Sequence, residues 1–274
     1  MPSTGASGDL LERADRCFLG AAGPDGPAVL PVASWSDGQA LWMSAPTASL
    51  PATASDPEAE WVAYVPPRQA HEPGLLVHGR IRVYSLDDPL RLALHAPTIS
   101  AAMAALAAHH AGAVLGAVGE AARAPHRWQP RNRAVIRLVV HARREVDPPD
   151  VGPGVAPPLP PVVPAAVRRG LAGRRRLVLV FGDPGDLHAT PAVWGPGFVL
   201  RTPPTLRPDR GNGAVAAVDV EGPPGPRRPV GLALHGEVDA GGRLVPERMT
   251  SWCGPDMVSA AVAGPVAGGV VLPD

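Results

Sequence analysis

The 274-residue chain carries no net charge, with 25 basic and 25 acidic residues, and 45% of its residues are hydrophobic. This composition is typical of a globular protein, and the lack of a basic excess excludes the electrostatic footprint of a nucleic-acid-binding protein. Every basic residue is arginine, as a high-GC genome favours, so neither a Schiff-base lysine nor a Walker lysine is available.

No segment of the chain is expected to enter a membrane or to direct export. No apolar run approaches the roughly 20 residues that span a bilayer, and residues 1–16 have neither the basic nor the apolar region of a signal peptide. Cys17 and Cys253 lie far apart and have no metal-type spacing. We therefore expect a reduced, cytoplasmic protein without a membrane partner.

The first 84 residues contain short apolar runs separated by turns. The 36 prolines and 31 glycines of the chain favour such an arrangement over a helical one. The predicted strands lie within 17–26, 31–35, 41–47, 61–65 and 74–83, and a closing strand follows at 134–146. Short strands with regular turn signals predict an antiparallel barrel or sandwich.

An insert at 85–133 separates the fifth strand from the closing strand. Within it, residues 100–124 predict a helix, because Met103 and Leu106 begin an apolar series with helical spacing. Ser100 is a suitable N-cap, and Pro125 ends the pattern. We expect this helix to cover one open side of the first barrel and to have no counterpart in the second.

A proline-rich stretch at 148–164 reads as a semi-extended linker. After it, the strand pattern of the first half returns in the same order. The second set of predicted strands lies within 177–185, 191–194, 198–205, 215–220 and 231–240, with a closing strand at 242–252.

The two sets of strands match each other position by position. GLLVHGRIRV (74–83) and GLALHGEVDA (231–240) share Gly, Leu, His and Gly at the same places. The offset drifts only from 160 at the first strand (17 to 177) to 157 at the histidines (78 to 235). This pattern predicts a tandem duplication. The predicted parts are a first domain at 10–147, a linker at 148–172, a second domain at 173–258 and a tail at 259–274.

The first copy resembles the pyridoxamine 5'-phosphate oxidase-like, FMN-binding split-barrel proteins, which include flavin/deazaflavin oxidoreductases. The resemblance rests on the stretch from CFLGAAGPDG (17–26) to WVAYV (61–65), followed by GLLVHGRIRV (74–83). It implies a mainly β fold with an α insert, in which two tandem split β-barrels pack as a pseudo-dimer. It also implies FMN at the barrel interface, in a monomeric pseudo-dimer or a homodimer.

The same resemblance places a phosphate-binding turn after the third strand. In the first copy this turn offers the hydroxyls of Thr47 and Ser49 but no basic side chain. In the second copy Arg201, Arg207 and Arg210 could hold a phosphate through charge-assisted hydrogen bonds. The sequence therefore predicts at most one competent FMN site, with its positive charge drawn from the second copy.

His78 and His235 are the histidines that occupy the same position in both copies. One interpretation is that they face the inter-barrel cleft and bind a cofactor ring. The other is a buried hydrogen bond inherited through the duplication.

The predicted function is that of an FMN-dependent oxidoreductase acting on a small organic substrate, with the chemistry supplied by the flavin. No hydrolase or zinc-site motif is present, and no catalytic side chain or metal ligand is identified. The alternative is a binding or scaffold protein with a degenerate flavin site, either free of cofactor or holding haem or another planar ligand.

Overall fold

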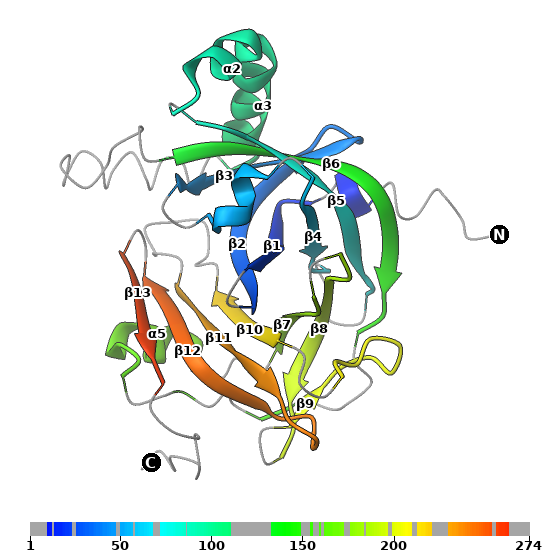
Figure 1. Ribbon diagram of the computed structural model, residues 1–274, viewed down its shortest axis with the longest axis vertical. Coiled ribbons are helices and arrows are strands. Elements are labelled where there is room, and N and C mark those ends of the chain that lie inside the picture. Colours follow the sequence, from blue (N-terminus) through cyan, green and yellow to red (C-terminus); the bar gives the residue numbers. More distant parts are fainter. Residues whose placement is uncertain are drawn as a thin grey trace.

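The protein is mainly β, as predicted, and consists of a closed barrel stacked on a second sheet (Figure 1). The computed structural model describes residues 10–12, 14–23, 26–47, 50–56, 58–67, 72–85, 87–110, 133–148, 154–155, 159, 162–172, 176–183, 185–196, 199–209, 213–220, 230–253 and 256–262. No helix in these ranges is both long enough and apolar enough to cross a membrane.

The barrel closes in the order β1-β2-β3-β6-β5-β4, with every neighbouring pair antiparallel. Its strands are β1 (Arg16–Gly23), β2 (Gly26–Ser36), β3 (Ala40–Pro46), β4 (Glu60–Val65), β5 (Gly74–Tyr84) and β6 (Arg133–Val146). Alternate residues point inward, so Leu41, Met43, Ile136 and Leu138 fill the interior.

The second unit is a seven-stranded sheet in the order β13-β12-β11-β10-β7-β8-β9. Its strands are β7 (Arg176–Phe181), β8 (His188–Trp194), β9 (Leu200–Arg201), β10 (Gly213–Val220), β11 (Val230–Val238), β12 (Leu244–Cys253) and β13 (Asp256–Ala261). The neighbours of β7 to β12 repeat those of β1 to β6 except at one place. The pair β3–β6 closes the barrel, whereas β12 pairs with β13, and β9 is only two residues long. The second unit is thus an opened form of the same barrel.

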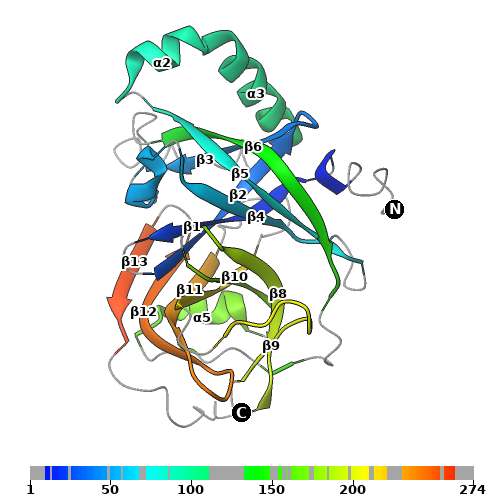
Figure 2. The same cartoon turned by 45° about the vertical axis from the view of Figure 1, so that its right-hand side comes forward.

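Short helical segments before β1 and β7 fill the two cores. Residues 10–12 are helical and bury Leu11 in the barrel. Helix α5 (Ala165–Leu171) buries Val167 and Leu171 against the concave face of the second sheet (Figure 2). Linker residues Val155 and Leu159 pack on the same core. Part of the proline-rich stretch therefore contributes to the second core.

The insert forms α2 (Pro89–Leu94) and α3 (Ala96–His109), which lie on the side of the barrel away from the second sheet (Figure 1). The helix expected at 100–124 begins earlier, at Ala96, so Ser100 lies inside it and does not cap it. Pro97 in the first turn permits this early start. Residues 111–132 lie outside the described ranges.

Helix α3 packs on the outer wall of the barrel rather than over an open side, because the barrel is closed. Ile99 and Ala102 contact an outward-facing aromatic pair, Trp42 and Tyr84, whose rings stack with centroids 6.4 Å apart.

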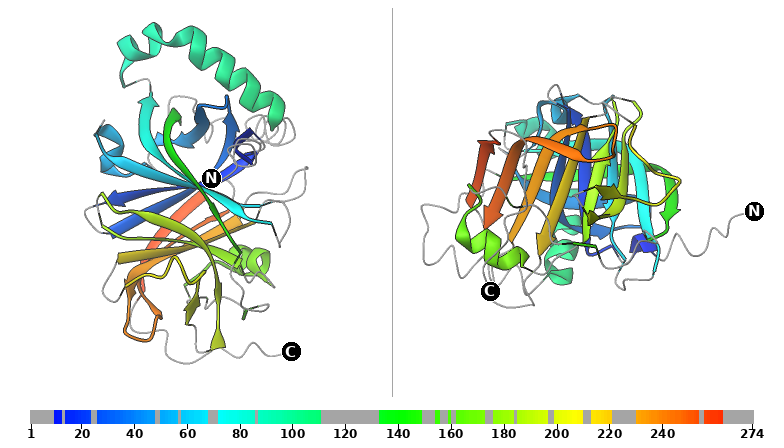
Figure 3. Two further views of the ribbon diagram at one scale, coloured as in Figure 1. Left: turned by 90° about the vertical axis from the view of Figure 1, so that its right-hand side faces the viewer. Right: turned by 90° about the horizontal axis from the view of Figure 1, so that it is seen from below.

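A third apolar cluster joins the barrel to the sheet. It includes Phe18, Val62 and Leu76 from the barrel, and Val180 and Val215 from the sheet. At its centre a Cβ added to Gly20 would lie 2.9 Å from a methyl group of Val180. These residues are 160 positions apart, which is the offset between the first strands of the two copies. Contact between equivalent residues is the property of a twofold axis, so the units pack as a pseudo-dimer (Figure 3).

Candidate functional site

Both repeat-matched histidines lie at β-bulges. The pairing of β5 with β6 shifts between His78 and Gly79, and that of β11 with β12 shifts between His235 and Gly236. A Cβ on Gly79 would overlap the carbonyl oxygen of Val139, and a Cβ on Gly236 would overlap that of Val245. Glycine is therefore required at each bulge. The bulges lie at opposite ends of the pseudo-dimer interface.

At one end, the His235 imidazole reaches across the interface to the β1–β2 hairpin. Its Nδ1 lies 3.4 Å from the carbonyl oxygen of Pro27. Burial lowers the pKa of His235 to about 4, with a smaller lowering from the charge of Arg248, so the ring is neutral at pH 7. Because a carbonyl oxygen only accepts, this contact places the proton on Nδ1. The Nε2 atom is left as a hydrogen-bond acceptor.

His235 lines an open groove of about 780 Å³ between the barrel and the sheet. This volume lies within the range of small-molecule and cofactor sites. Much of the wall is backbone, because glycine recurs in the lining at Gly23, Gly26, Gly182, Gly213 and Gly236. Small residues and one neutral imidazole thus form the uncharged part of the groove wall.

The charged side chains of the groove lie on its rim. Asp183, Glu237, Glu247 and Arg248 line it and are exposed. Arg248 pairs in register with His235 across β11 and β12, which places its charge beside the imidazole. Three carboxylates and one guanidinium give this rim a negative formal charge at pH 7.

The opposite end of the interface, around His78, differs from the His235 end because side chains occupy the positions that correspond to the groove. Burial lowers the pKa of His78, and the charge of nearby His188 lowers it further. Glu60 and Asp186 oppose these effects. The Nε2 atom of His188 lies 3.1 Å from a carboxylate oxygen of Asp186. In register, Val62 faces His78 and Val215 faces His235, so Glu60 stands where the groove has Gly213. The two ends are therefore chemically unequal.

The predicted phosphate residues are distributed over several places. Arg201 is exposed on β9, with its guanidinium beside Gly195. Arg207 is exposed in a turn that Leu206 anchors in the interface cluster. Neither lines the groove, and Arg210 lies outside the described residues.

In the first copy, the Thr47 hydroxyl is buried and has no hydrogen-bond partner among the described residues. The hydroxyl of Thr53, at the other end of the same turn, is in the same state. Ser49 lies outside the described ranges. Of the residues that were predicted for the cofactor and are described in the structure, only His235 lines the groove.

The groove residues that the sequence did not single out are Asp183, Glu237, Glu247 and Arg248. They come from the end of β7 and from two neighbouring strands, and only strand register brings them together. The GPDG turn at 23–26 was the one visible signal, because the glycines at both of its ends line the groove.

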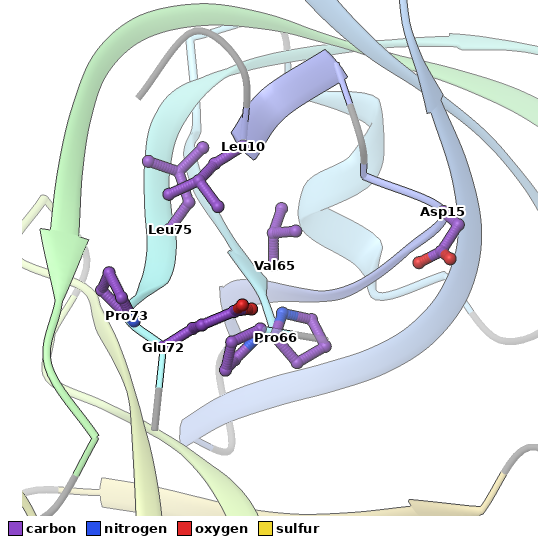
Figure 4. A pocket seen from close by; sticks show the side chains of 8 residues that line it. Leu10, Asp15, Val65, Pro66, Glu72, Pro73 and Leu75 are labelled. Atoms are coloured by element: carbon purple, nitrogen blue, oxygen red, sulfur yellow. The ribbon is translucent and has the colours of Figure 1, made fainter. Parts of the chain in front are cut away.

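A second cavity, of about 40 Å³, lies at one mouth of the barrel (Figure 4). Leu10, Val65, Pro66, Pro73 and Leu75 give it an apolar lining, with the carboxylates of Asp15 and Glu72 at its edge. This volume suits ordered water rather than a cofactor.

Other reactive chemistry finds no support among the described side chains. No group of three or more His, Cys, Asp or Glu in these ranges could hold a metal ion. Cys17 is buried in the barrel, and burial raises the pKa of its thiol to about 12, which leaves no thiolate for nucleophilic attack.

No protein-family model matches the sequence, and no curated protein is similar to it. Several solved structures, including the following three, are similar to about half of the chain. A pyridoxamine 5'-phosphate oxidase candidate from Listeria innocua is 13% identical over 50% of this chain and 92% of its own, with a TM-score of 0.30. An F420 reductase is 17% identical over 51% and 96%, with a TM-score of 0.34. The haem storage protein HutZ from Vibrio cholerae is 9% identical over 51% and 92%, with a TM-score of 0.36. These values are too low to transfer a cofactor or an activity.

Proposed function

We propose that the protein binds a flavin-type cofactor in the groove between the barrel and the sheet, and that it acts as an oxidoreductase on a small organic substrate. The observation that carries this proposal is the groove of about 780 Å³ at the interface, with neutral His235 in its wall. When bound, the flavin would supply the hydride or electron transfer, and the protein would supply binding and orientation.

The groove residues fit a flavin ring. Glycines and Pro27 in the lining leave room for a planar ring system, because they carry little side-chain bulk. The flavin ring carries one N–H group between two carbonyls, and the Nε2 of His235 is an acceptor for such a donor. The hydrogen bond from His235 to Pro27 keeps the imidazole in this tautomer.

The sequence resemblance predicts FMN, with Arg201, Arg207 and Arg210 as its phosphate ligands. Because Arg201 and Arg207 do not line the groove, our proposal concerns the flavin ring and not the phosphate. The two units would then provide within one chain the interface that two subunits provide elsewhere, as a product of tandem duplication. We infer that the protein acts as a monomeric pseudo-dimer.

The test is flavin titration, followed by flavin fluorescence, with a matched pair of histidine variants. His235→Gln removes the acceptor in the groove, and His78→Gln makes the same change at the opposite end of the interface. We expect His235→Gln to weaken riboflavin binding about 10-fold, the value of one hydrogen bond lost from a half-buried site. His78→Gln should bind as the wild type does. Equal loss in both variants, or no binding by the wild type, would overturn the proposal.

The second candidate function is a binding or scaffold role without flavin. The observation that favours it is the negative rim, together with the absence of Arg201 and Arg207 from the groove lining. An absorbance spectrum of the purified protein separates the candidates. A band at about 450 nm indicates flavin, and an intense band at about 400 nm indicates haem. No band above the protein absorbance, together with no flavin titration, favours the scaffold.

A further inference from the structure

We propose that the groove selects an uncharged flavin, of the riboflavin class, over one that carries a phosphate. The inference rests on the proposed function and concerns the same site. It follows from the sign of the charge on the described groove residues and from the absence of Arg201 and Arg207 from the lining.

The charge of the groove is set by few groups. Asp183, Glu237 and Glu247 contribute three negative charges and Arg248 one positive charge. None of the three carboxylates forms an ion pair with another described side chain. His235 is neutral at pH 7, because burial lowers its pKa to about 4. The described lining residues therefore carry a net formal charge of −2, given by one arginine against three carboxylates.

No helix N-terminus in the described lining compensates for this charge. The glycine segments of the lining belong to strands β1, β2, β10 and β11 and to the end of β7, and no helix begins in the groove. A helix N-terminus, which supplies anion-binding N–H groups in many nucleotide sites, is therefore absent from the described lining.

A phosphate in or near the groove carries about two negative charges at pH 7. The rim carboxylates are exposed, so water and salt weaken each interaction with the phosphate. Summed over the net charge, the expected discrimination against FMN is about 3- to 10-fold at low salt. An uncharged ribityl chain experiences no such repulsion.

The experiment compares riboflavin with FMN on the full chain at two ionic strengths. At about 0.02 M salt we expect riboflavin to bind about 3- to 10-fold more tightly than FMN, and at about 0.5 M salt the two affinities should converge. FMN binding more tightly than riboflavin at low salt would overturn the inference and leave the proposed function intact. No binding of either flavin would overturn the proposed function itself.

Charge variants test whether the discrimination against FMN comes from the rim carboxylates. Glu237→Gln/Glu247→Gln removes two carboxylates from the rim, whereas Asp56→Asn/Glu58→Gln makes the same charge change at exposed residues outside the groove lining. We expect the rim variant to raise the ratio of FMN affinity to riboflavin affinity about 3- to 10-fold at low salt. The control should leave the ratio of the two affinities unchanged. An equal effect of both variants would show a general charge effect and would contradict the inference.

Discussion

At the scale of the residue, neutral His235 links the stability of the fold to pH. Its pKa is about 4 in the folded protein, against an ordinary value of 6.5. The unfolded chain therefore binds a proton at a pH where the folded protein does not. The stabilisation is fully present above about pH 6.5 and is lost as the pH falls toward 4.

We expect the free energy of unfolding to fall by up to about 3 kcal/mol from this group between pH 7 and pH 4, since each pKa unit is worth about 1.4 kcal/mol. His235→Gln should lose much less over the same range, and an exposed control, His109→Gln, should follow the wild type. Urea unfolding at several pH values measures the difference. The same slope in wild type and His235→Gln would contradict the assignment.

The repeat-matched histidines were predictable as a pair, but their inequality was not. Sequence comparison found His78 and His235 because both precede a glycine on the fifth strand of their copy. Their surroundings come from strands distant in the sequence. Glu60 and Gly213 occupy corresponding places next to the two histidines, and only the register of β4 and β10 shows it. Arg201 and Arg207 do not line the groove, and for the same reason the sequence alone did not show this.

At the scale of the element, the strands were predictable where alternation decides burial, as in β1 to β6. The helices were less predictable than the strands. Residues 165–171 form α5 within a segment that its prolines marked as linker, and its helical state depends on Val167 and Leu171 packing under the second sheet. The sequence also did not predict that the second sheet is open. Whether β12 pairs with β9 or with β13 depends on contacts over the whole fold, which local sequence patterns do not show.

Helix α3 gives a prediction at this scale. Ile99 is buried against Trp42 and Tyr84, while the adjacent Ser100 is exposed. Ile99→Ala should lower the free energy of unfolding by about 2–4 kcal/mol, as expected for truncation of a buried isoleucine. Ser100→Ala should change it by less than about 0.5 kcal/mol. Chemical denaturation of the full chain measures both. An equal effect of the two substitutions would contradict the packing of α3 on the barrel wall.

At the scale of the whole molecule, the barrel and the sheet are held together around the point where β1 crosses β7. The cluster that joins them is apolar and buried, and it contains residues of both units. Such an interface resembles a subunit contact placed within one chain. Both units contribute residues to the groove: Pro27 comes from the barrel and His235 from the sheet. Its geometry therefore depends on how closely the two units approach.

Glycine at position 20 allows β1 to pack closely against β7, and a double-mutant cycle tests this role. A Cβ at this position would lie 2.9 Å from a methyl group of Val180 and 2.9 Å from one of Val62. Gly20→Ala should therefore lower the free energy of unfolding by about 1–3 kcal/mol through overpacking. Val180→Ala alone should also destabilise, because it leaves a cavity in the interface. In the double variant the truncated side chain at position 180 leaves room for the new methyl group.

We therefore expect Gly20→Ala/Val180→Ala to be more stable than the sum of the single changes predicts, by at least about 1 kcal/mol. Relief should be incomplete, because Val62 still contacts the new methyl group. Gly20→Ala/Val167→Ala is the matched control, since Val167 is buried in the core of the second unit and belongs to a different apolar cluster. That pair should be additive within about 0.5 kcal/mol. Additivity in both pairs would show that β1 and β7 do not meet at Gly20 and Val180, and the pseudo-twofold arrangement would fail with it.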